Sequence, residues 1–155
     1  MDCVNNPVCF KLLVRACRKR IGEIHKTHPF QAIVATGLSG ASIAYPLSYL
    51  TGIPVFYIRK EGDTTHGAAM ELAHQIEGVR GYLIVDDLIE SGNTLLRLLQ
   101  TMHNFDYIND RSQRTRLSCV GILLYNNGYG GKEPRDYRFQ LDGVNHEIIL
   151  PAWTV

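Results

Sequence analysis

The segment spanning residues 82–94, Tyr-Leu-Ile-Val-Asp-Asp-Leu-Ile-Glu-Ser-Gly-Asn-Thr, carries the strongest chemical signal in the sequence. Four apolar residues precede two adjacent carboxylates, Asp86 and Asp87. The small polar residues that follow lead into a predicted helix, so loop amides, a helix N-terminus and two hydroxyls would together favour a phosphate group. Gly92 would let the backbone approach that phosphate closely. Two carboxylates beside a phosphate site suit the hydroxyls of a sugar and a hydrated Mg²⁺.

A simpler interpretation of the same segment is a strand followed by a capped helix. Ser91 or Asn93 would then be the cap, and the small polar residues would need no other explanation. That interpretation does not account for two carboxylates at the end of an otherwise apolar strand. The segment therefore points to a binding site, and the elements around it must position that site.

Short apolar runs alternate with helical patterns along the chain. Strands are expected at residues 32–35, 55–58, 82–85 and 117–125, and helices at residues 7–25, 40–50, 68–76 and 91–103. Asn5 or Asn6 would cap the first helix, with Val8 and Leu12 on its apolar side. The alternation predicts an α/β fold with a single, mostly parallel, twisted sheet flanked by helices.

Parallel sheets bind ligands at the carboxyl ends of their strands. The candidate site segments are therefore residues 36–42, 59–67, 86–94 and 125–135. Residues 104–116 are polar and are expected to form an exposed connection. Residues 139–141 and 148–150 could pair as a hairpin across Asp142 and Gly143.

Length and composition limit the classes of protein that the sequence can represent. The 155 residues fit one domain, residues 1–155, and 16 Lys and Arg against 15 Asp and Glu give no reason to expect nucleic acid or an acidic membrane as a partner. No apolar run approaches the roughly 20 residues of a membrane span, and the N-terminus does not resemble a signal peptide. We therefore expect a cytoplasmic protein with four free thiols. His25 and His28 lie at a predicted helix end, where they would complement the helix dipole rather than bind a metal.

Residues 82–94 resemble the 5-phosphoribosyl 1-pyrophosphate (PRPP) motif of the type I phosphoribosyltransferases. That motif has four apolar residues, two acids, two apolar residues, a variable residue and then Thr/Ser-Gly-x-Thr, and every position matches here. A looser resemblance covers roughly residues 30–153 and implies the fold of this family, with a small hood formed by the chain ends. In such enzymes Asp86 and Asp87 would hold the ribose hydroxyls and, through water, Mg²⁺. The 5′-phosphate would be bound by Glu90, Ser91, Gly92, Asn93 and Thr94.

The other strand ends take on roles by the same resemblance. Residues 36–42 are similar to the family's pyrophosphate loop, and residues 59–67 to its mobile catalytic loop, most closely that of orotate phosphoribosyltransferases. Pyrophosphate would then be bound by Leu38, Ser39, Gly40, Arg59 and Lys60. The catalytic residues would be Lys60, His66, Glu90 and the two aspartates. The loop departs from the family pattern because Asp63 or Thr64 stands near the place of a second lysine.

The residues that would select the base give conflicting signals. The loop at residues 59–67 slightly favours orotate. Glu90 and the tail at residues 148–153 instead resemble 6-oxopurine phosphoribosyltransferases, although Tyr125 and Asn126 replace a lysine that those enzymes use. Trp153 in that tail could stack on a base, with Tyr125 and Asn126 beside it.

The resemblance implies a Mg²⁺-dependent phosphoribosyltransferase that joins PRPP and a nucleobase into a nucleoside 5′-monophosphate. It also implies a homodimer whose substrates are small molecules, with no nucleic acid and no membrane among its partners. A PRPP-sensing regulatory protein is the alternative from another class, because an intact phosphate site with a degraded catalytic loop would be its signature.

Overall fold

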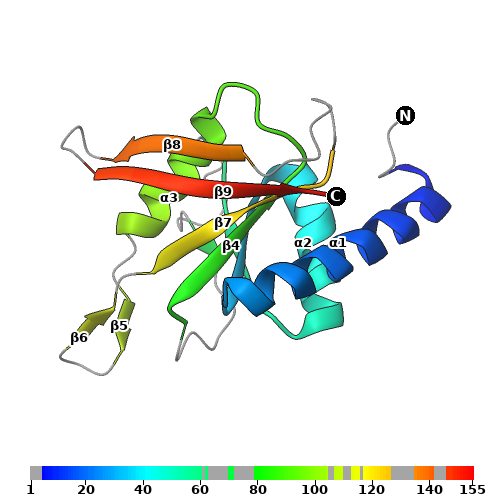
Figure 1. The fold of residues 1–155 in the computed structure, drawn as a ribbon, viewed down its shortest axis with the longest axis horizontal. Coiled ribbons are helices and arrows are strands. Elements are labelled where there is room, and N and C mark those ends of the chain that lie inside the picture. The colour runs from blue at the N-terminus through cyan, green and yellow to red at the C-terminus, as the bar shows by residue number, and fades with distance from the viewer. Residues whose placement is uncertain are drawn as a thin grey trace.

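The computed structural model describes residues 5–60, 62, 70–71, 79–104, 107–109, 113–115, 117–126, 135–141 and 146–155. The helices are α1 (Pro7–Thr27), α2 (Gly37–Thr51) and α3 (Asn93–Asn104). The strands are β1 (Ala32–Thr36), β2 (Val55–Ile58), β3 (Met70–Glu71), β4 (Gly81–Asp86), β5 (Tyr107–Asn109), β6 (Gln113–Thr115), β7 (Ser118–Leu124), β8 (Arg135–Leu141) and β9 (His146–Thr154) (Figure 1).

Seven strands form one sheet in the order β3-β2-β1-β4-β7-β9-β8. The five inner strands, β2, β1, β4, β7 and β9, run parallel, and β3 and β8 pair antiparallel at the two edges. The prediction of a mostly parallel sheet flanked by helices is confirmed. The predicted terminal hairpin is also confirmed and is longer than expected, since β8 and β9 pair from Arg135 opposite Ala152 to Leu141 opposite His146.

Alternate side chains of the central strands supply two hydrophobic cores, one on each face of the sheet. On the face covered by α3, Val34, Ile84 and Ile122 are buried. On the other face, Ile33, Leu83 and Leu123 pack with the buried residues of α1 and α2. Burial on both faces explains why these strands read as continuous apolar runs in the sequence.

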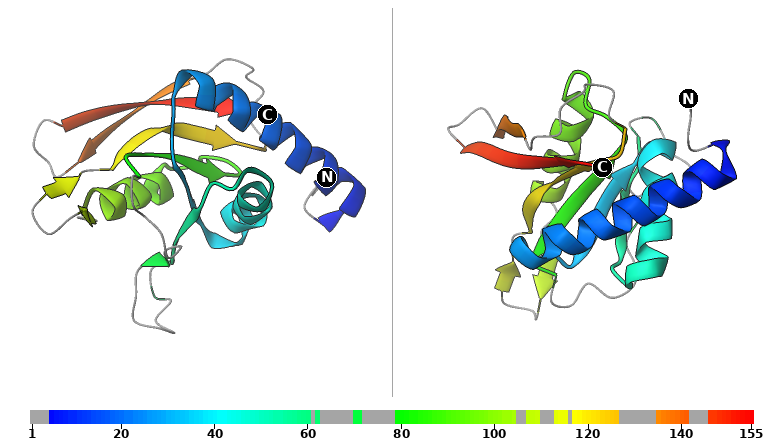
Figure 2. Two further views of the ribbon diagram at one scale, coloured as in Figure 1. Left: turned by 90° about the horizontal axis from the view of Figure 1, so that it is seen from below. Right: turned by 45° about the vertical axis from the view of Figure 1, so that its right-hand side comes forward.

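Helix α1 begins at the predicted cap. The side chain of Asn6 accepts hydrogen bonds from the backbone N–H groups of Val8 and Cys9, and Pro7 occupies the first turn. Val8 and Leu12 were expected to be buried, but they are 72% and 59% exposed. Figures 1 and 2 show the reason, because the N-terminal part of α1 extends past the ends of the strands.

One segment expected to be helical and one expected to be a connection contain strands instead. Residues 68–76 were predicted to be helical, but Met70–Glu71 forms strand β3 against β2, and the rest of that prediction lies outside the described residues. Residues 104–116 include β5 and β6, which pair as a separate two-stranded sheet. Both strand pairs are too short to give a periodic pattern in the sequence.

The N-terminal helix covers one face of the sheet, and the C-terminal strand belongs to the sheet itself. In the described part of the chain, α1 packs against α2 and the sheet, while β9 extends the sheet beside β7 and buries Leu150 and Ala152. A hood formed by the chain ends stays a prediction. None of the described helices is long and apolar enough to cross a membrane.

The structure shows the state of three cysteines and the packing of the two histidines at the end of α1. Cys17 and Cys119 are free thiols, as expected, and burial raises the pKa of each to about 12. Cys9 is disulfide-bonded, so the expectation of four free thiols is wrong. His25 and His28 end α1 and pack edge-on against the rings of Phe30 and Trp153, which supports a structural role for both.

Candidate active site

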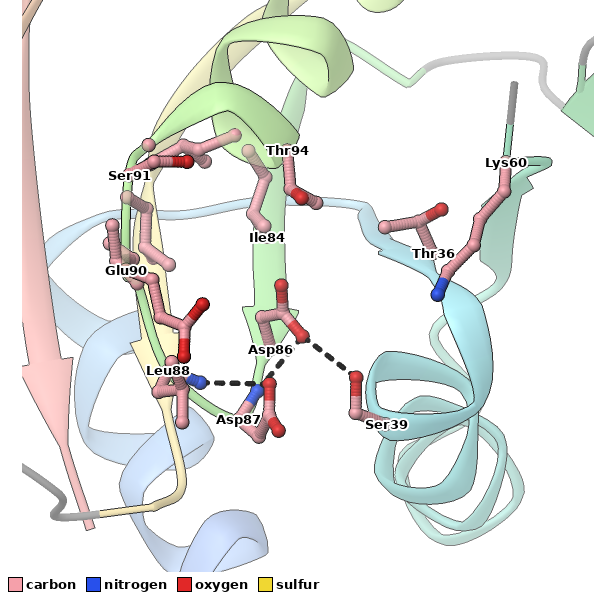
Figure 3. A pocket seen from close by; sticks show the side chains of 14 residues that line it. Thr36, Ser39, Lys60, Ile84, Asp86, Asp87, Leu88, Glu90, Ser91 and Thr94 are labelled. Atoms are coloured by element: carbon pink, nitrogen blue, oxygen red, sulfur yellow. Dashed lines mark hydrogen bonds between the residues drawn. The ribbon is translucent and has the colours of Figure 1, made fainter.

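A cavity of about 300 Å³ lies at the carboxyl ends of β1, β2 and β4. Its lining comes from four segments that are far apart in the sequence: Thr36 and Ser39; Lys60; Ile84, Asp86, Asp87, Leu88, Ile89, Glu90, Ser91, Gly92, Thr94 and Leu95; and Ile122. Figure 3 shows Glu90 and Ser91 on one side, Thr36, Ser39 and Lys60 on the other, and Asp86 between them. The cavity therefore has two polar walls and an acidic centre.

The two predicted carboxylates are adjacent at the end of β4. Oδ1 of Asp86 accepts hydrogen bonds from the Ser39 hydroxyl at 3.2 Å and from the Asp87 backbone N–H at 2.9 Å. Oδ1 of Asp87 accepts from the Leu88 N–H at 2.9 Å. Burial, reinforced by the neighbouring Asp87, raises the pKa of Asp86 to about 6. A cation would relieve the cost of keeping this carboxylate ionised.

The loop after the carboxylates leads into α3 as the sequence predicts. Gly92 has a positive φ of 79°, immediately before the helix begins at Asn93. The N–H of Asn93 donates to the Ser91 hydroxyl at 3.4 Å, and the Leu96 N–H donates to the Gly92 carbonyl at 2.9 Å. Gly92 therefore occupies the cap position of α3, and Ser91, just before it, bonds the first helical N–H and also lines the cavity. Asn93 is not part of the cavity lining.

The opposite wall is the start of α2. The helix begins at Gly37, three residues earlier than predicted, and the capping residue Thr36 makes no side-chain bond to the first-turn amides. Ser39 lines the cavity, whereas the Leu38 side chain is 83% exposed and Gly40 lies against β4, where an added Cβ would be 3.1 Å from the Val85 carbonyl oxygen. A helix N-terminus without a side-chain cap favours an anion at this wall.

Lys60 supplies a positive charge at the same wall. Its side chain crosses Gly37, since a Cβ added to Gly37 would lie 2.8 Å from Cε and 3.4 Å from Nζ of Lys60. Figure 3 shows the ammonium group directed toward the first turn of α2. Arg59 does not line the cavity, and His66 lies outside the described residues.

The three residues expected to contact the base do not line this cavity. The Tyr125 hydroxyl donates to the Ser39 carbonyl at 2.8 Å, and the Asn126 N–H donates to the Asp87 carbonyl at 2.9 Å. Both residues therefore hold the backbone of site residues without lining the cavity. Trp153 packs on the α1 side of the sheet against His28. A Cβ at Gly121 would overlap the Trp153 ring, which leaves this indole a packing role.

Sequence reasoning missed Arg97 and did not single out Thr36. Thr36 is only 3% exposed, and its hydroxyl accepts a hydrogen bond from the Arg97 guanidinium at 2.9 Å. A partial signal was available for Arg97, because it lies three residues after Thr94 and so shares a face of α3 with a residue of the PRPP motif.

Asp86 and Asp87 are the residues that could hold a metal ion. The described residues contain no group of three or more His, Cys, Asp or Glu side chains placed for a metal. Mg²⁺ is often bound through one or two carboxylates together with water and substrate phosphates, so this carboxylate pair fits Mg²⁺. The raised pKa of Asp86 agrees with a carboxylate that is more stable next to a cation.

Comparisons with known proteins agree with this architecture. Part of the chain is similar to adenine phosphoribosyltransferase from Treponema denticola, with 33% identity over 92 residues. The match covers 51% of this chain and 48% of that relative, so it spans about half of the relative's length. No family model matches the chain.

Solved structures show the fold. An adenine phosphoribosyltransferase has a TM-score of 0.59 at 17% identity, covering 98% of this chain and 82% of the other. Orotate phosphoribosyltransferase from Francisella tularensis has a TM-score of 0.58 at 14% identity, over 85% and 56% of the two chains. The Mycobacterium tuberculosis enzyme, solved in complex with PRPP, has a TM-score of 0.55 at 16% identity, over 80% and 64%. The chain has the fold of the type I phosphoribosyltransferases.

Proposed function

We propose that this protein is a Mg²⁺-dependent phosphoribosyltransferase that transfers the phosphoribosyl group of PRPP to a nucleobase. The observation that carries the proposal is the position of Asp86 and Asp87 between two anion-favouring walls of one cavity. PRPP has the same three parts, with a ribose between a 5′-phosphate and a pyrophosphate. The loop at residues 90–94 would bind the phosphate, and Lys60 with the first turn of α2 would bind the pyrophosphate.

The chemistry is a substitution at the anomeric carbon of the ribose. A nitrogen of the base forms a bond to that carbon while the carbon–oxygen bond to pyrophosphate breaks, and pyrophosphate leaves with the electron pair. The proton on the base nitrogen is lost, and the Glu90 carboxylate, which lines the cavity, would accept it. The transition state resembles an oxocarbenium ion, so the protein contributes mainly positioning and electrostatics.

The remaining roles follow from the charges of the reacting groups. Bound Mg²⁺ would offset the negative charge of the pyrophosphate, and Asp86 and Asp87 would hold it through water. Lys60 would hold the leaving pyrophosphate and Asp86 would orient the ribose. We also propose that Arg59 and His66 act within a loop that excludes water from the reaction.

The acceptor base is proposed from the loop motif and from the relatives. The resemblance of residues 59–67 to orotate enzymes makes orotate the first candidate, and the 33% identity to an adenine phosphoribosyltransferase makes adenine the second. The 6-oxopurines are the third, because Glu90 and the tail resemble their enzymes. A cytoplasmic location remains a prediction.

The test is pyrophosphate release from PRPP and Mg²⁺ with orotate, uracil, adenine, hypoxanthine, guanine or xanthine. We expect one of the bases to give its nucleoside 5′-monophosphate with stoichiometric pyrophosphate, and the Lys60→Ala variant to be slower. PRPP binding without turnover of any base would favour the PRPP-sensing protein instead. Absence of both PRPP binding and turnover of any base would contradict the proposal.

A further inference from the structure

We propose that Arg97 is a positioning residue that holds the end of β2 so that Lys60 stays over the first turn of α2. The inference rests on the proposed function, because it concerns the wall assigned to pyrophosphate. It starts from the hydrogen bonds of one guanidinium group. Nη1 of Arg97 donates to the Arg59 carbonyl at 2.6 Å, and Nη2 donates to the Thr36 hydroxyl at 2.9 Å.

The Thr36 hydroxyl extends this arrangement to a second carbonyl of the same segment. It donates to the Ile58 carbonyl at 2.6 Å while it accepts from Arg97. Arg97 therefore fixes two successive carbonyls at the end of β2, one directly and one through Thr36. The Thr36 side chain is buried, so this bridge is shielded from competition with water.

The bridge matters because the strand pairing stops before Lys60. The register between β1 and β2 ends with Thr36 opposite Ile58, and Lys60 lies two residues further on. The carbonyl that Arg97 holds belongs to the residue just before Lys60. The Lys60 side chain then crosses Gly37, where the positive φ of 63° and the missing Cβ leave room for it.

The geometry of the contact explains why an arginine is needed. A guanidinium presents donors at a fixed spacing, so it can bond a carbonyl and a hydroxyl of two different strands at once. A lysine at position 97 would keep the charge but would reach these two acceptors from a single nitrogen. Arg97 therefore acts through Lys60 rather than by touching the substrate.

A double-mutant cycle tests this coupling. PRPP affinity in the presence of Mg²⁺ would be measured by calorimetry for wild type, Arg97→Gln, Lys60→Ala and the double variant. We expect each single variant to bind about tenfold more weakly and the double variant to match Lys60→Ala to within about twofold, because Arg97 would act only through Lys60 and the two losses would then not add. Losses that multiply would show that Arg97 acts independently of Lys60 and would overturn the inference.

Two further variants separate positioning from simple stability. Arg97→Lys should bind PRPP with intermediate affinity, and Arg15→Gln, which removes an exposed arginine on α1, should bind like wild type. Urea unfolding of each variant shows whether it is folded under the binding conditions. Wild-type affinity in a folded Arg97→Gln variant would contradict the proposal.

A chemical measurement keeps the inference testable if wild type fails to bind PRPP, in which case the proposed function fails separately. Acetylation of lysines by an amine-reactive ester can be followed peptide by peptide with mass spectrometry. In Arg97→Gln we expect the Lys60 rate to change relative to Lys11 and Lys19 as its side chain leaves Gly37, with those two lysines unchanged as internal controls. An unchanged Lys60 rate would overturn the inference.

Discussion

Asp86 is the residue whose chemistry the fold changes most within the candidate site. Its carboxylate is half-buried and lies beside Asp87, and its hydrogen-bond donors within the described residues, Ser39 and the Asp87 N–H, also belong to the site. Burial and the adjacent acid raise its pKa to about 6, which makes the ionised form costly in the absence of a cation. The same environment would favour binding of Mg²⁺ with its substrate.

Asp86→Asn should therefore stabilise the ligand-free protein at neutral pH. The folded pKa of about 6 lies above the ordinary 3.8, so the favourable contribution of this group is complete below 3.8 and is lost as the pH rises through 6. We expect the substitution to add about 1–3 kcal/mol to the free energy of unfolding at pH 8 and little at pH 4. Urea unfolding at the two pH values measures this, with Glu90→Gln as the control. Equal destabilisation at both pH values would contradict this explanation.

At this scale, the sequence predicted the part of the site that is continuous in the chain. Asp86, Asp87, Ser91 and Thr94 belong to one motif, and the structure brings all of them to one cavity. The role of Arg97 could not be predicted, because its partners are 38 and 61 residues away and only the folded sheet brings them together.

At the scale of elements, the start of α2 and the end of β2 form one wall of the cavity. Gly37 lets the helix begin directly after β1 and leaves room for Lys60. The short apolar runs predicted the central strands because each is buried on both faces. The exposure of Val8 and Leu12 could not be predicted, because an amphipathic pattern does not show how far the sheet extends beneath a helix.

Helix α1 contains a glycine, Gly22, at a position with room for a larger side chain. Nothing lies within 4 Å of a Cβ added to Gly22, and the residue is in the helix interior. Gly22→Ala should therefore raise the free energy of unfolding by about 0.5–1 kcal/mol, because alanine loses less backbone entropy in a helix. Urea unfolding measures the change, and a destabilised variant would contradict the description of α1.

Gly121, in strand β7, is the opposite case to Gly22, because the space around it is filled. It has a φ of 152°, and a Cβ there would overlap the ring of Trp153 and lie 2.5 Å from the Pro151 carbonyl oxygen. Gly121→Ala should therefore lower the free energy of unfolding by about 2 kcal/mol or more. A neutral effect would show that Trp153 does not pack here and would reopen its predicted role at the base.

At the scale of the whole molecule, several exposed apolar side chains lie on α1 and α2. Val8, Leu12, Tyr45, Tyr49 and Leu50 are exposed, and Tyr49 is 89% exposed. These side chains are candidate contacts for the predicted homodimer. Tyr49→Glu should shift the protein toward monomers in sedimentation experiments, whereas Ile149→Glu, an exposed apolar residue on β9, should not. A wild-type monomer at all concentrations would refute the prediction.

A net charge of +1 does not argue against a polyanionic substrate, because the charges that matter are local. Lys60, two helix N-termini and a carboxylate pair suited to Mg²⁺ surround one cavity. Titration calorimetry of PRPP in the presence of Mg²⁺ tests this central claim most directly. We predict binding to the wild-type protein and at least a hundredfold loss, about 2.7 kcal/mol, in the Asp86→Asn, Asp87→Asn double variant. Unchanged affinity in a folded double variant would contradict the assignment of this cavity to PRPP.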